Sequence, residues 1–162
     1  MTLTRREWIG SAGVAGIALV LGGVGGSAGA KPRFAFTLTD AEWKKRLSPA
    51  AYAVLRHEAT ERAGSSPLDH EHRRGIFACA GCGQPLFRSS AKFDSGTGWP
   101  SFTAPIKSAV GIATDFKLGI PRKAVFCSRC GGHLGHVFDD GPPPTGQRWC
   151  INGVALKFVP QA

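Results

Sequence analysis

Five cysteines carry most of the chemistry that this sequence of 162 residues offers. Four of them form two Cys-x-x-Cys pairs, Cys79 with Cys82 and Cys127 with Cys130. The fifth, Cys150, stands alone in the C-terminal part of the chain. Paired spacing is typical of metal ligands, whereas a lone cysteine is a candidate nucleophile. The sequence therefore predicts one metal site and one separate reactive thiol.

Each Cys-x-x-Cys pair predicts a tight turn that presents two thiolates to one ion, and four thiolates suit tetrahedral zinc. The 44 residues between the pairs, 83–126, mean that the ion would join distant parts of one domain. Four thiolates leave no open coordination position, which favours a structural ion over a catalytic one. The alternative is two disulfide bonds, which an oxidising compartment would favour.

The lone cysteine lies in the segment Arg148-Trp149-Cys150-Ile151-Asn152. Side chains alternate along a strand, so Arg148, Cys150 and Asn152 would share one face. A guanidinium beside the sulfur favours the thiolate, which is the nucleophilic form, and an amide can position neighbouring groups. The spacing alone fits a buried structural cysteine with two polar neighbours equally well.

Two histidines, His133 and His136, precede a loop, residues 139–147, that is rich in Asp, Gly and Pro. Antiparallel pairing of the strands on either side of this loop can place His136 opposite Cys150. His133 has the opposite side-chain parity, so a bulge, for example at Gly135, is needed to bring it to the same pocket. Taken alone, either histidine also fits a satisfied position in the core.

Four motifs resemble those of the B-type methionine sulfoxide reductases: AGCGQPLF, KFDSGTGWPSF, GGHLGHVFDDGPPPTG and RWCINGVALKF. These enzymes reduce the R epimer of methionine sulfoxide, and the similarity spans roughly Thr39 to Phe158. The resemblance implies a mainly β fold, a small open barrel of antiparallel sheets with N-terminal helices and zinc at one edge. It also implies oxidised proteins or peptides as substrates, and a thioredoxin-like protein or a small thiol as reductant.

The resemblance implies a role for each candidate residue. Cys150 would attack the sulfoxide sulfur and become a sulfenic acid. Either His136 or His133 would protonate the departing oxygen. Trp99 would pack on the S-methyl group of the substrate and Phe138 would line the same pocket, although both rings also suit core positions. Many members of the family carry the four-cysteine zinc site.

One departure from the family's common pattern bears on the chemistry. Thr97 stands where many members have a second cysteine that resolves the sulfenic acid into a disulfide. A hydroxyl cannot form that bond, and the four remaining cysteines are assigned to zinc. We therefore expect the sulfenic acid at Cys150 to wait for an external thiol.

The elements that must position these residues are predicted from local patterns. Thr39-Asp40-Ala41-Glu42 is a capping box that predicts a short helix, and Ser48-Pro49 predicts the start of a second helix. From Gly75 onward, short apolar runs are cut by Gly, Pro, Ser and Asp, as in a turn-rich β domain. The predicted strands are residues 76–78, 110–113, 123–126, 134–138 and the run 148–159.

Residues 1–30 are predicted to be a twin-arginine (Tat) export signal, apart from the reductase domain at 31–162. Arg5-Arg6 precede an uncharged segment, residues 9–30, which ends in the cleavage pattern Ala28-Gly29-Ala30. Eight glycines make the segment weakly hydrophobic, which argues against the alternative, a stable membrane anchor. The protein is then periplasmic or otherwise exported. Because this route carries folded proteins, zinc can bind in the reducing cytosol, which argues against the disulfides.

The formal net charge of +9 raises the question of nucleic acid. The basic residues are scattered in short groups such as Lys44-Lys45-Arg46, and no basic stripe is interleaved with aromatic residues. A solvated basic surface without a nucleic-acid partner is therefore expected.

Two other functions fit part of the pattern. A zinc-ribbon-like binding or chaperone module accounts for the paired cysteines and the histidines, but it leaves the face formed by Arg148, Cys150 and Asn152 unexplained. Another thiol enzyme, such as a glutathione-dependent carbonyl-processing protein on a related zinc fold, is the second alternative. An activity assay on both epimers of methionine sulfoxide separates all three functions.

Arg5→Lys together with Arg6→Lys is expected to keep the protein in the cytosol, because the export route recognises the arginine pair. Fractionation of cells that express the wild type and the double variant measures this, and the exported form should begin at Lys31. Unchanged export of the double variant would indicate another route or a membrane anchor.

Overall fold

The computed structural model describes residues 34–117 and 119–161. The predicted export signal, residues 1–30, lies outside the described residues, so it stays a prediction. Within the described part, none of the helices has both the length and the apolar character that crossing a bilayer requires.

Two short helices begin at the capping signals. Helix α1 spans Asp40–Arg46, and the reciprocal capping box between Thr39 and Glu42 satisfies its first turn. Helix α2 spans Pro49–His57, and the Ser48 hydroxyl accepts a hydrogen bond from the third residue of that turn. Both helices were predicted from these residues. The apolar face that α2 buries consists of Ala51, Val54 and Leu55.

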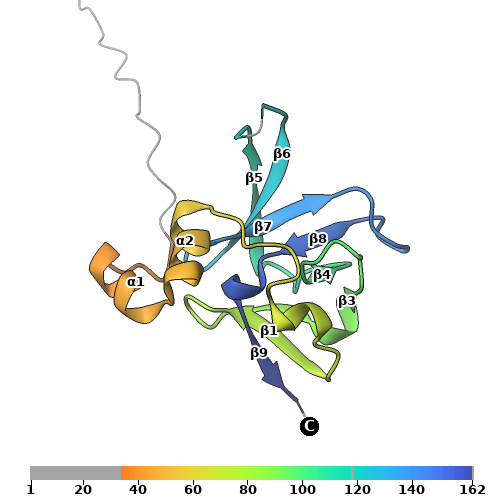
Figure 1. The fold of residues 1–162 in the computed structure, drawn as a ribbon, viewed down its shortest axis with the longest axis horizontal. Coiled ribbons are helices and arrows are strands. Elements are labelled where there is room, and N and C mark those ends of the chain that lie inside the picture. The colour runs from red at the N-terminus through yellow and green to blue at the C-terminus, as the bar shows by residue number, and fades with distance from the viewer. Residues whose placement is uncertain (1–33, 118, 162) are drawn as a thin grey trace, which may run out of the picture. The chain divides into compact units, whose positions relative to one another are not determined.

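The rest of the described chain is mainly β, as predicted, with short strands joined by tight turns (Figure 1). Three 3₁₀ turns, η1, η2 and η3, span Pro67–His70, Ser89–Ala91 and Gly153–Ala155. The strands are β1 (Gly75–Cys79), β2 (Pro85–Arg88), β3 (Lys92–Phe93), β4 (Ser101–Phe102), β5 (Val110–Asp115), β6 (Arg122–Cys127), β7 (His133–Phe138), β8 (Arg148–Ile151) and β9 (Leu156–Pro160).

The strands form two antiparallel sheets. The smaller sheet has the order β2-β1-β9, and the larger has the order β3-β4-β8-β7-β6-β5. Both sheets stay open, so the predicted antiparallel architecture is confirmed without a closed barrel. The β5–β6 hairpin extends beyond the other strands at the top of Figure 1, and β5 ends the order of the larger sheet.

The apolar run 148–159, which the sequence presents as one stretch, divides between the two sheets. Strand β8 ends at Ile151, η3 turns the chain, and β9 joins the smaller sheet. The Glu61 carboxylate stabilises this turn, because it accepts hydrogen bonds from the backbone N–H groups of Gly153 and Val154. The turn between β8 and β9 therefore depends on a residue far away in the sequence, and no pattern within the run 148–159 predicts it.

The β7–β8 hairpin has the register that the sequence allowed but did not fix. His136 pairs with Cys150, and Phe138 pairs with Arg148. The two strands approach so closely that a Cβ at Gly135 would lie 2.1 Å from the Cys150 carbonyl oxygen. Only glycine fits there, which fixes this register against a shift of one residue.

A bulge in β7 brings the second histidine to the same side of the sheet. The register with β6 passes from Gly135 directly to His133, so Leu134 is the extra residue. The rings of His133 and His136 then lie 5.3 Å apart, centroid to centroid. The predicted bulge is confirmed, one residue before the glycine.

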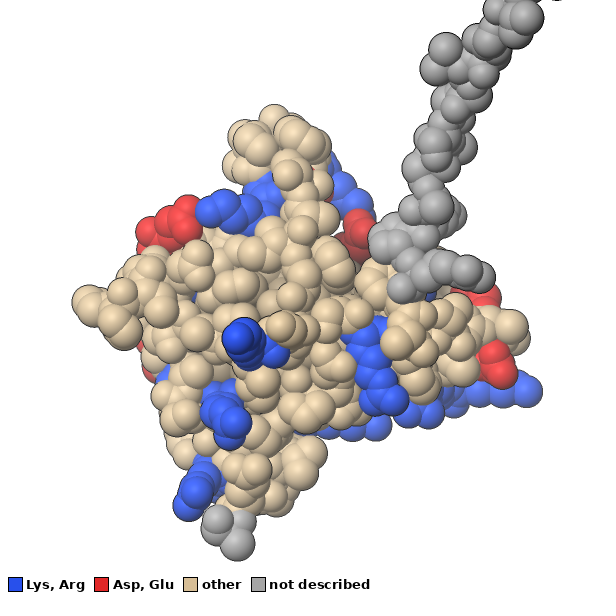
Figure 2. Space-filling model, turned by 180° about the vertical axis from the view of Figure 1, so that it is seen from behind, with Lys and Arg blue, Asp and Glu red and all other residues tan. Residues whose placement is uncertain are grey.

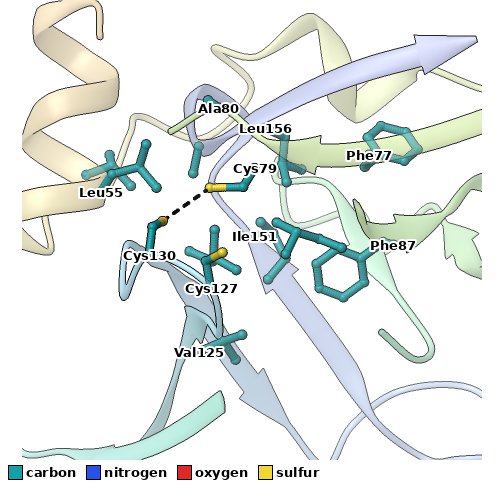
Figure 3. Close-up of a cluster of buried hydrophobic side chains, with 14 of the residues drawn as sticks. Leu55, Phe77, Cys79, Ala80, Phe87, Val125, Cys127, Cys130, Ile151 and Leu156 are labelled. Atoms are coloured by element: carbon teal, nitrogen blue, oxygen red, sulfur yellow. Dashed lines mark hydrogen bonds between the residues drawn. The ribbon is translucent and has the colours of Figure 1, made fainter. Parts of the chain in front are cut away.

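The core lies where the two sheets and α2 meet. Phe87 and Phe102 stack with their ring centroids 4.3 Å apart, and Phe77 meets Phe102 edge-on at 5.0 Å. Figure 3 shows three of the paired cysteines in this core, beside Leu55 of α2 and Ile151 of β8. On the face that Figure 2 shows, Lys and Arg side chains are scattered between stretches of uncharged surface.

Candidate active site and metal centre

The four paired cysteines form one buried cluster. Their sulfur atoms all lie within 4.8 Å of one another. The Sγ atoms of Cys79 and Cys130 are 3.8 Å apart (dashed in Figure 3), and those of Cys82 and Cys127 are 3.6 Å apart. A disulfide requires about 2.05 Å. Four sulfurs about 2.3 Å from a central zinc would be about 3.8 Å apart, so these residues fit a tetrahedral metal ion.

Backbone hydrogen bonds shape both pairs into the same kind of turn. The N–H of Gly83 donates to the Cys79 carbonyl, and the N–H of Gly131 donates to the Cys127 carbonyl. Both glycines have left-handed backbone conformations, φ 75° and 69°, that other residues adopt only with strain. Two equivalent turns therefore face each other across the cluster.

Positive charge surrounds the cluster. Three guanidinium groups donate hydrogen bonds to carbonyls of the two turns: Arg46 to Gly81, Arg129 to Cys82 and Arg56 to Cys130. Hydrogen bonding to the other cysteines, Cys127 first, together with burial raises the pKa of Cys79. Four thiolates packed this closely therefore need a cation between them.

The remaining cysteine lies in a separate pocket of about 140 Å³ on the larger sheet. Cys150 is half-buried, in contrast to the fully enclosed paired cysteines. Five predicted residues line this pocket together, and Thr60, Arg122 and Gly135 complete its wall. The five are Trp99, His136, Phe138, Cys150 and Asn152.

The environment of Cys150 acts on its thiol in two opposite directions. Burial raises the pKa of the thiol, and Asp140 adds to that effect, whereas Arg148 and a hydrogen bond from Thr97 lower it. Burial is the largest contribution, so the pKa stays above its ordinary value. Arg148 favours the thiolate as expected, but burial outweighs it.

Arg148 is fixed beside the pocket rather than in its wall. Its guanidinium makes two hydrogen bonds, of 2.9 and 2.8 Å, with the Asp140 carboxylate. It also lies over the Phe138 ring, 4.5 Å from the centroid. These contacts hold the positive charge at a fixed position next to Cys150.

Asn152 and Trp99 are held by one segment that sequence reasoning missed. The buried Asn152 amide donates to the Leu134 carbonyl and accepts from the backbone N–H of Glu61. The Glu61 carbonyl in turn accepts from the Trp99 indole at 3.2 Å. Asn152 therefore connects the bulge of β7 to the segment that orients the indole. No local pattern around Glu61 announces these contacts.

His136 also has a partner that the sequence did not single out. Its Nε2 lies 2.8 Å from the Asp115 carboxylate at the end of β5, and both side chains are nearly nine-tenths buried. Asp115 also pairs with Arg122 across the β5–β6 hairpin. Hydrogen bonds from the Lys117 backbone, His136 and Arg122 hold the pKa of Asp115 well below its ordinary value. The ionised carboxylate accepts, so Nε2 of His136 carries the proton.

His133 lies in different surroundings. It lines a neighbouring cavity of about 330 Å³, next to Leu55 and Glu58, rather than the Cys150 pocket. Its Nε2 is buried without a hydrogen-bond partner among the described residues. Burial, followed by the charge of His136, lowers the pKa of His133 to about 4. His133 is therefore neutral at physiological pH.

Comparison with known proteins agrees with this arrangement. A protein-family model described as SelR domain matches residues 47–160. Several similar proteins carry the name peptide methionine sulfoxide reductase MsrB. The protein from Bradyrhizobium diazoefficiens is 55% identical over 124 residues, which cover 76% of this chain and 89% of that protein. The protein from Thiobacillus denitrificans is 54% identical over 124 residues, 76% and 94% of the two chains. The protein from Methanosarcina barkeri is 53% identical over 121 residues, 74% and 85%.

Proposed function

Because the chain belongs to the SelR-domain family of B-type methionine sulfoxide reductases, we propose that Cys150 reduces methionine (R)-sulfoxide in proteins or peptides. The protein is an oxidoreductase, a peptide-methionine (R)-S-oxide reductase. Membership of this family argues against a zinc-ribbon-like binding module and a carbonyl-processing enzyme. The observation that carries the proposal is the single pocket that Cys150 shares with Trp99 and His136.

The reaction begins with attack of the Cys150 thiolate on the sulfoxide sulfur. This attack forms a sulfur–sulfur bond, and a proton is added to the oxygen. The protonated oxygen then transfers to the Cys150 sulfur as the sulfur–oxygen and sulfur–sulfur bonds to the substrate break, and methionine leaves. Cys150 keeps the oxygen as a sulfenic acid, so the substrate sulfur is reduced and the cysteine sulfur is oxidised. The fixed charge of Arg148 favours the thiolate that this step consumes.

His136 is the general acid of the two histidines. The Asp115 carboxylate accepts a hydrogen bond from its Nε2–H, which leaves the other ring nitrogen for proton transfer in the pocket. His133, whose pKa is lowered to about 4, stays neutral and cannot serve as the acid near pH 7.

Two aromatic side chains supply the apolar part of the pocket. Trp99, which Glu61 holds by its indole N–H, packs on the S-methyl group, and Phe138 lines the wall beside it. The methyl group on the aromatic side and the oxygen on the His136 side define one handedness at sulfur. This arrangement accounts for selectivity toward the R epimer.

The sulfenic acid is returned to the thiol by an external reductant, a thioredoxin-like protein or a small thiol. Thr97, which lowers the pKa of the Cys150 thiol, stands where a resolving cysteine would be. The four other cysteines are enclosed in the metal cluster. No spare thiol therefore remains within the described residues for an internal disulfide.

We further propose that the metal is zinc, held by Cys79, Cys82, Cys127 and Cys130. Thiolate ligands and separations of 3.6–3.8 Å support this identity. Zinc bound there would join the two Cys-x-x-Cys turns and supply positive charge among four thiolates. The four cysteines lie among core side chains outside the Cys150 pocket, so an ion held there would take no part in the reaction.

Wild-type protein mixed with substrate and no reductant is expected to release about one equivalent of methionine per chain and then stop. A sulfenic-acid probe should label Cys150, and mass spectrometry should find no internal disulfide. Cys150→Ser should release no methionine while keeping fold and metal. Thr97→Cys should form a disulfide with Cys150, because Thr97 hydrogen-bonds to Ser95, and Ser95 hydrogen-bonds to Ser101, the residue opposite Cys150 in the sheet. A disulfide from Cys150 to a cluster cysteine, with loss of metal, would contradict this scheme.

Asp115→Asn is expected to lower kcat by roughly tenfold or more, with little change in KM, because the positioned acid loses its charged acceptor. Arg122→Met breaks the same ion pair but leaves Asp115 beside His136, so it should lower kcat less. Asp40→Asn, at an exposed carboxylate of α1, is the control and should leave kcat unchanged. Steady-state kinetics measure all three, and nitrogen NMR of His136 reports whether Nε2 keeps its proton. If Asp115→Asn and Arg122→Met lower kcat equally, Asp115 has a purely structural role.

The purified protein is expected to contain about one zinc per chain. Cys130→Ser should lose the metal and lower Tm by roughly ten degrees or more, because metal binding contributes directly to the free energy of folding. Cys150→Ser, outside the cluster, should keep both the metal and the Tm. Metal analysis that finds no zinc, with two disulfides by mass spectrometry, would refute the assignment.

A further inference from the structure

The β5–β6 hairpin exposes an unusual share of large apolar side chains. Three of the four most exposed in the described residues belong to it: Ile112, Phe116 and Ile120, at 51, 66 and 61% exposure. The fourth is Val159, on the smaller sheet. The tip of this hairpin extends beyond the body of the fold, so burial within the chain does not account for them (Figure 1).

A shallow groove connects this hairpin to the catalytic pocket. It runs between the hairpin and β7 and has a volume of about 270 Å³. Two of its residues, Arg122 and Phe138, also line the pocket of Cys150, so the two hollows share a wall. The residues of the groove are Ile120, Pro121, Arg122, Lys123, Val137, Phe138 and Asp139.

The charges along the groove are already paired. Lys123 forms a 3.0 Å ion pair with Asp139, and Arg122 is paired with Asp115. The groove therefore offers no unpaired charge to a ligand. Of its exposed side chains, Lys123 and Asp139 pair with each other, whereas Ile120 and Pro121 are apolar and favour apolar ligands.

The substrate supplies an occupant for this surface. A methionine sulfoxide side chain that reaches Cys150 leaves its own backbone at the mouth of the pocket. Each extended residue adds at most about 3.3–3.6 Å, so the side chains one or two residues away fall within reach of the adjoining groove. A free amino acid has no such neighbours and leaves the groove unused.

From this continuity we infer that the groove binds large apolar residues flanking the oxidised methionine of a polypeptide substrate, with Ile120 as the main contact. The inference rests on the proposed function and adds to it a determinant of substrate choice. It predicts selection among peptide substrates without any change in the chemical step.

Three substrates test this: a pentapeptide with leucine on both sides of methionine (R)-sulfoxide, the same peptide with serine, and N-acetylmethionine (R)-sulfoxide methylamide. Wild-type protein should show a kcat/KM for the leucine peptide roughly five- to tenfold above that for the serine peptide. Ile120→Ser should remove most of this difference and change kcat/KM for the methylamide less than about twofold. Val159→Ser removes an equally exposed apolar side chain elsewhere and should change none of the three values.

The outcomes separate the groove from the proposed function. Equal kcat/KM for the two peptides in the wild type, or an Ile120→Ser loss that is the same for all three substrates, overturns the groove alone. Failure of the wild type to reduce even the methylamide overturns the proposed function instead. Retained zinc and an unchanged Tm in Ile120→Ser show that the loss is not unfolding.

Discussion

The close approach of β7 to β8 at Gly135 is the constraint on which the site depends. A side chain at that position would collide with the Cys150 carbonyl, so the glycine sets which residues face one another. It places His136 opposite Cys150, and the neighbouring bulge turns His133 toward the same side. A shift of one residue would reverse every side chain of β8 and turn the nucleophile toward the core. Backbone sterics at this glycine, rather than electrostatic interactions, therefore determine which residues face Cys150.

Segments far from that hairpin in the sequence contribute contacts that position the residues of the pocket. The segment at Glu61 orients an amide and an indole and also ends the run that separates β8 from β9. The β5–β6 hairpin brings Asp115 to His136. The four-cysteine cluster joins the turns that hold the N-terminal ends of β7 and β2 near α2. The pocket is thus assembled from segments that carry few reactive groups of their own.

Local physical rules made part of the fold and part of the site predictable from the sequence. The Thr39 capping box and the Ser48-Pro49 start predict the two helices, Cys-x-x-Cys spacing predicts the four-cysteine cluster, and strand parity allows the His136–Cys150 pair. Asp115 and Glu61 escape such rules, because their contacts depend on how loops close over 21 to 92 residues of sequence. The division of the run 148–159 between two sheets could not be predicted for the same reason, because the Glu61 carboxylate stabilises the turn that divides it.

The alternation of side chains along β8 has a consequence for how the protein keeps two sulfur chemistries apart. Cys150 faces the pocket, whereas the next residue, Ile151, faces the core beside the paired cysteines (Figure 3). Thiol–disulfide exchange requires direct attack of one sulfur on another, so the burial of the four paired cysteines in the core separates their chemistry from that of Cys150. With the mechanism proposed above, an oxidant that enters the pocket would meet Cys150, which a reductant can restore, whereas the four buried cysteines stay out of its reach.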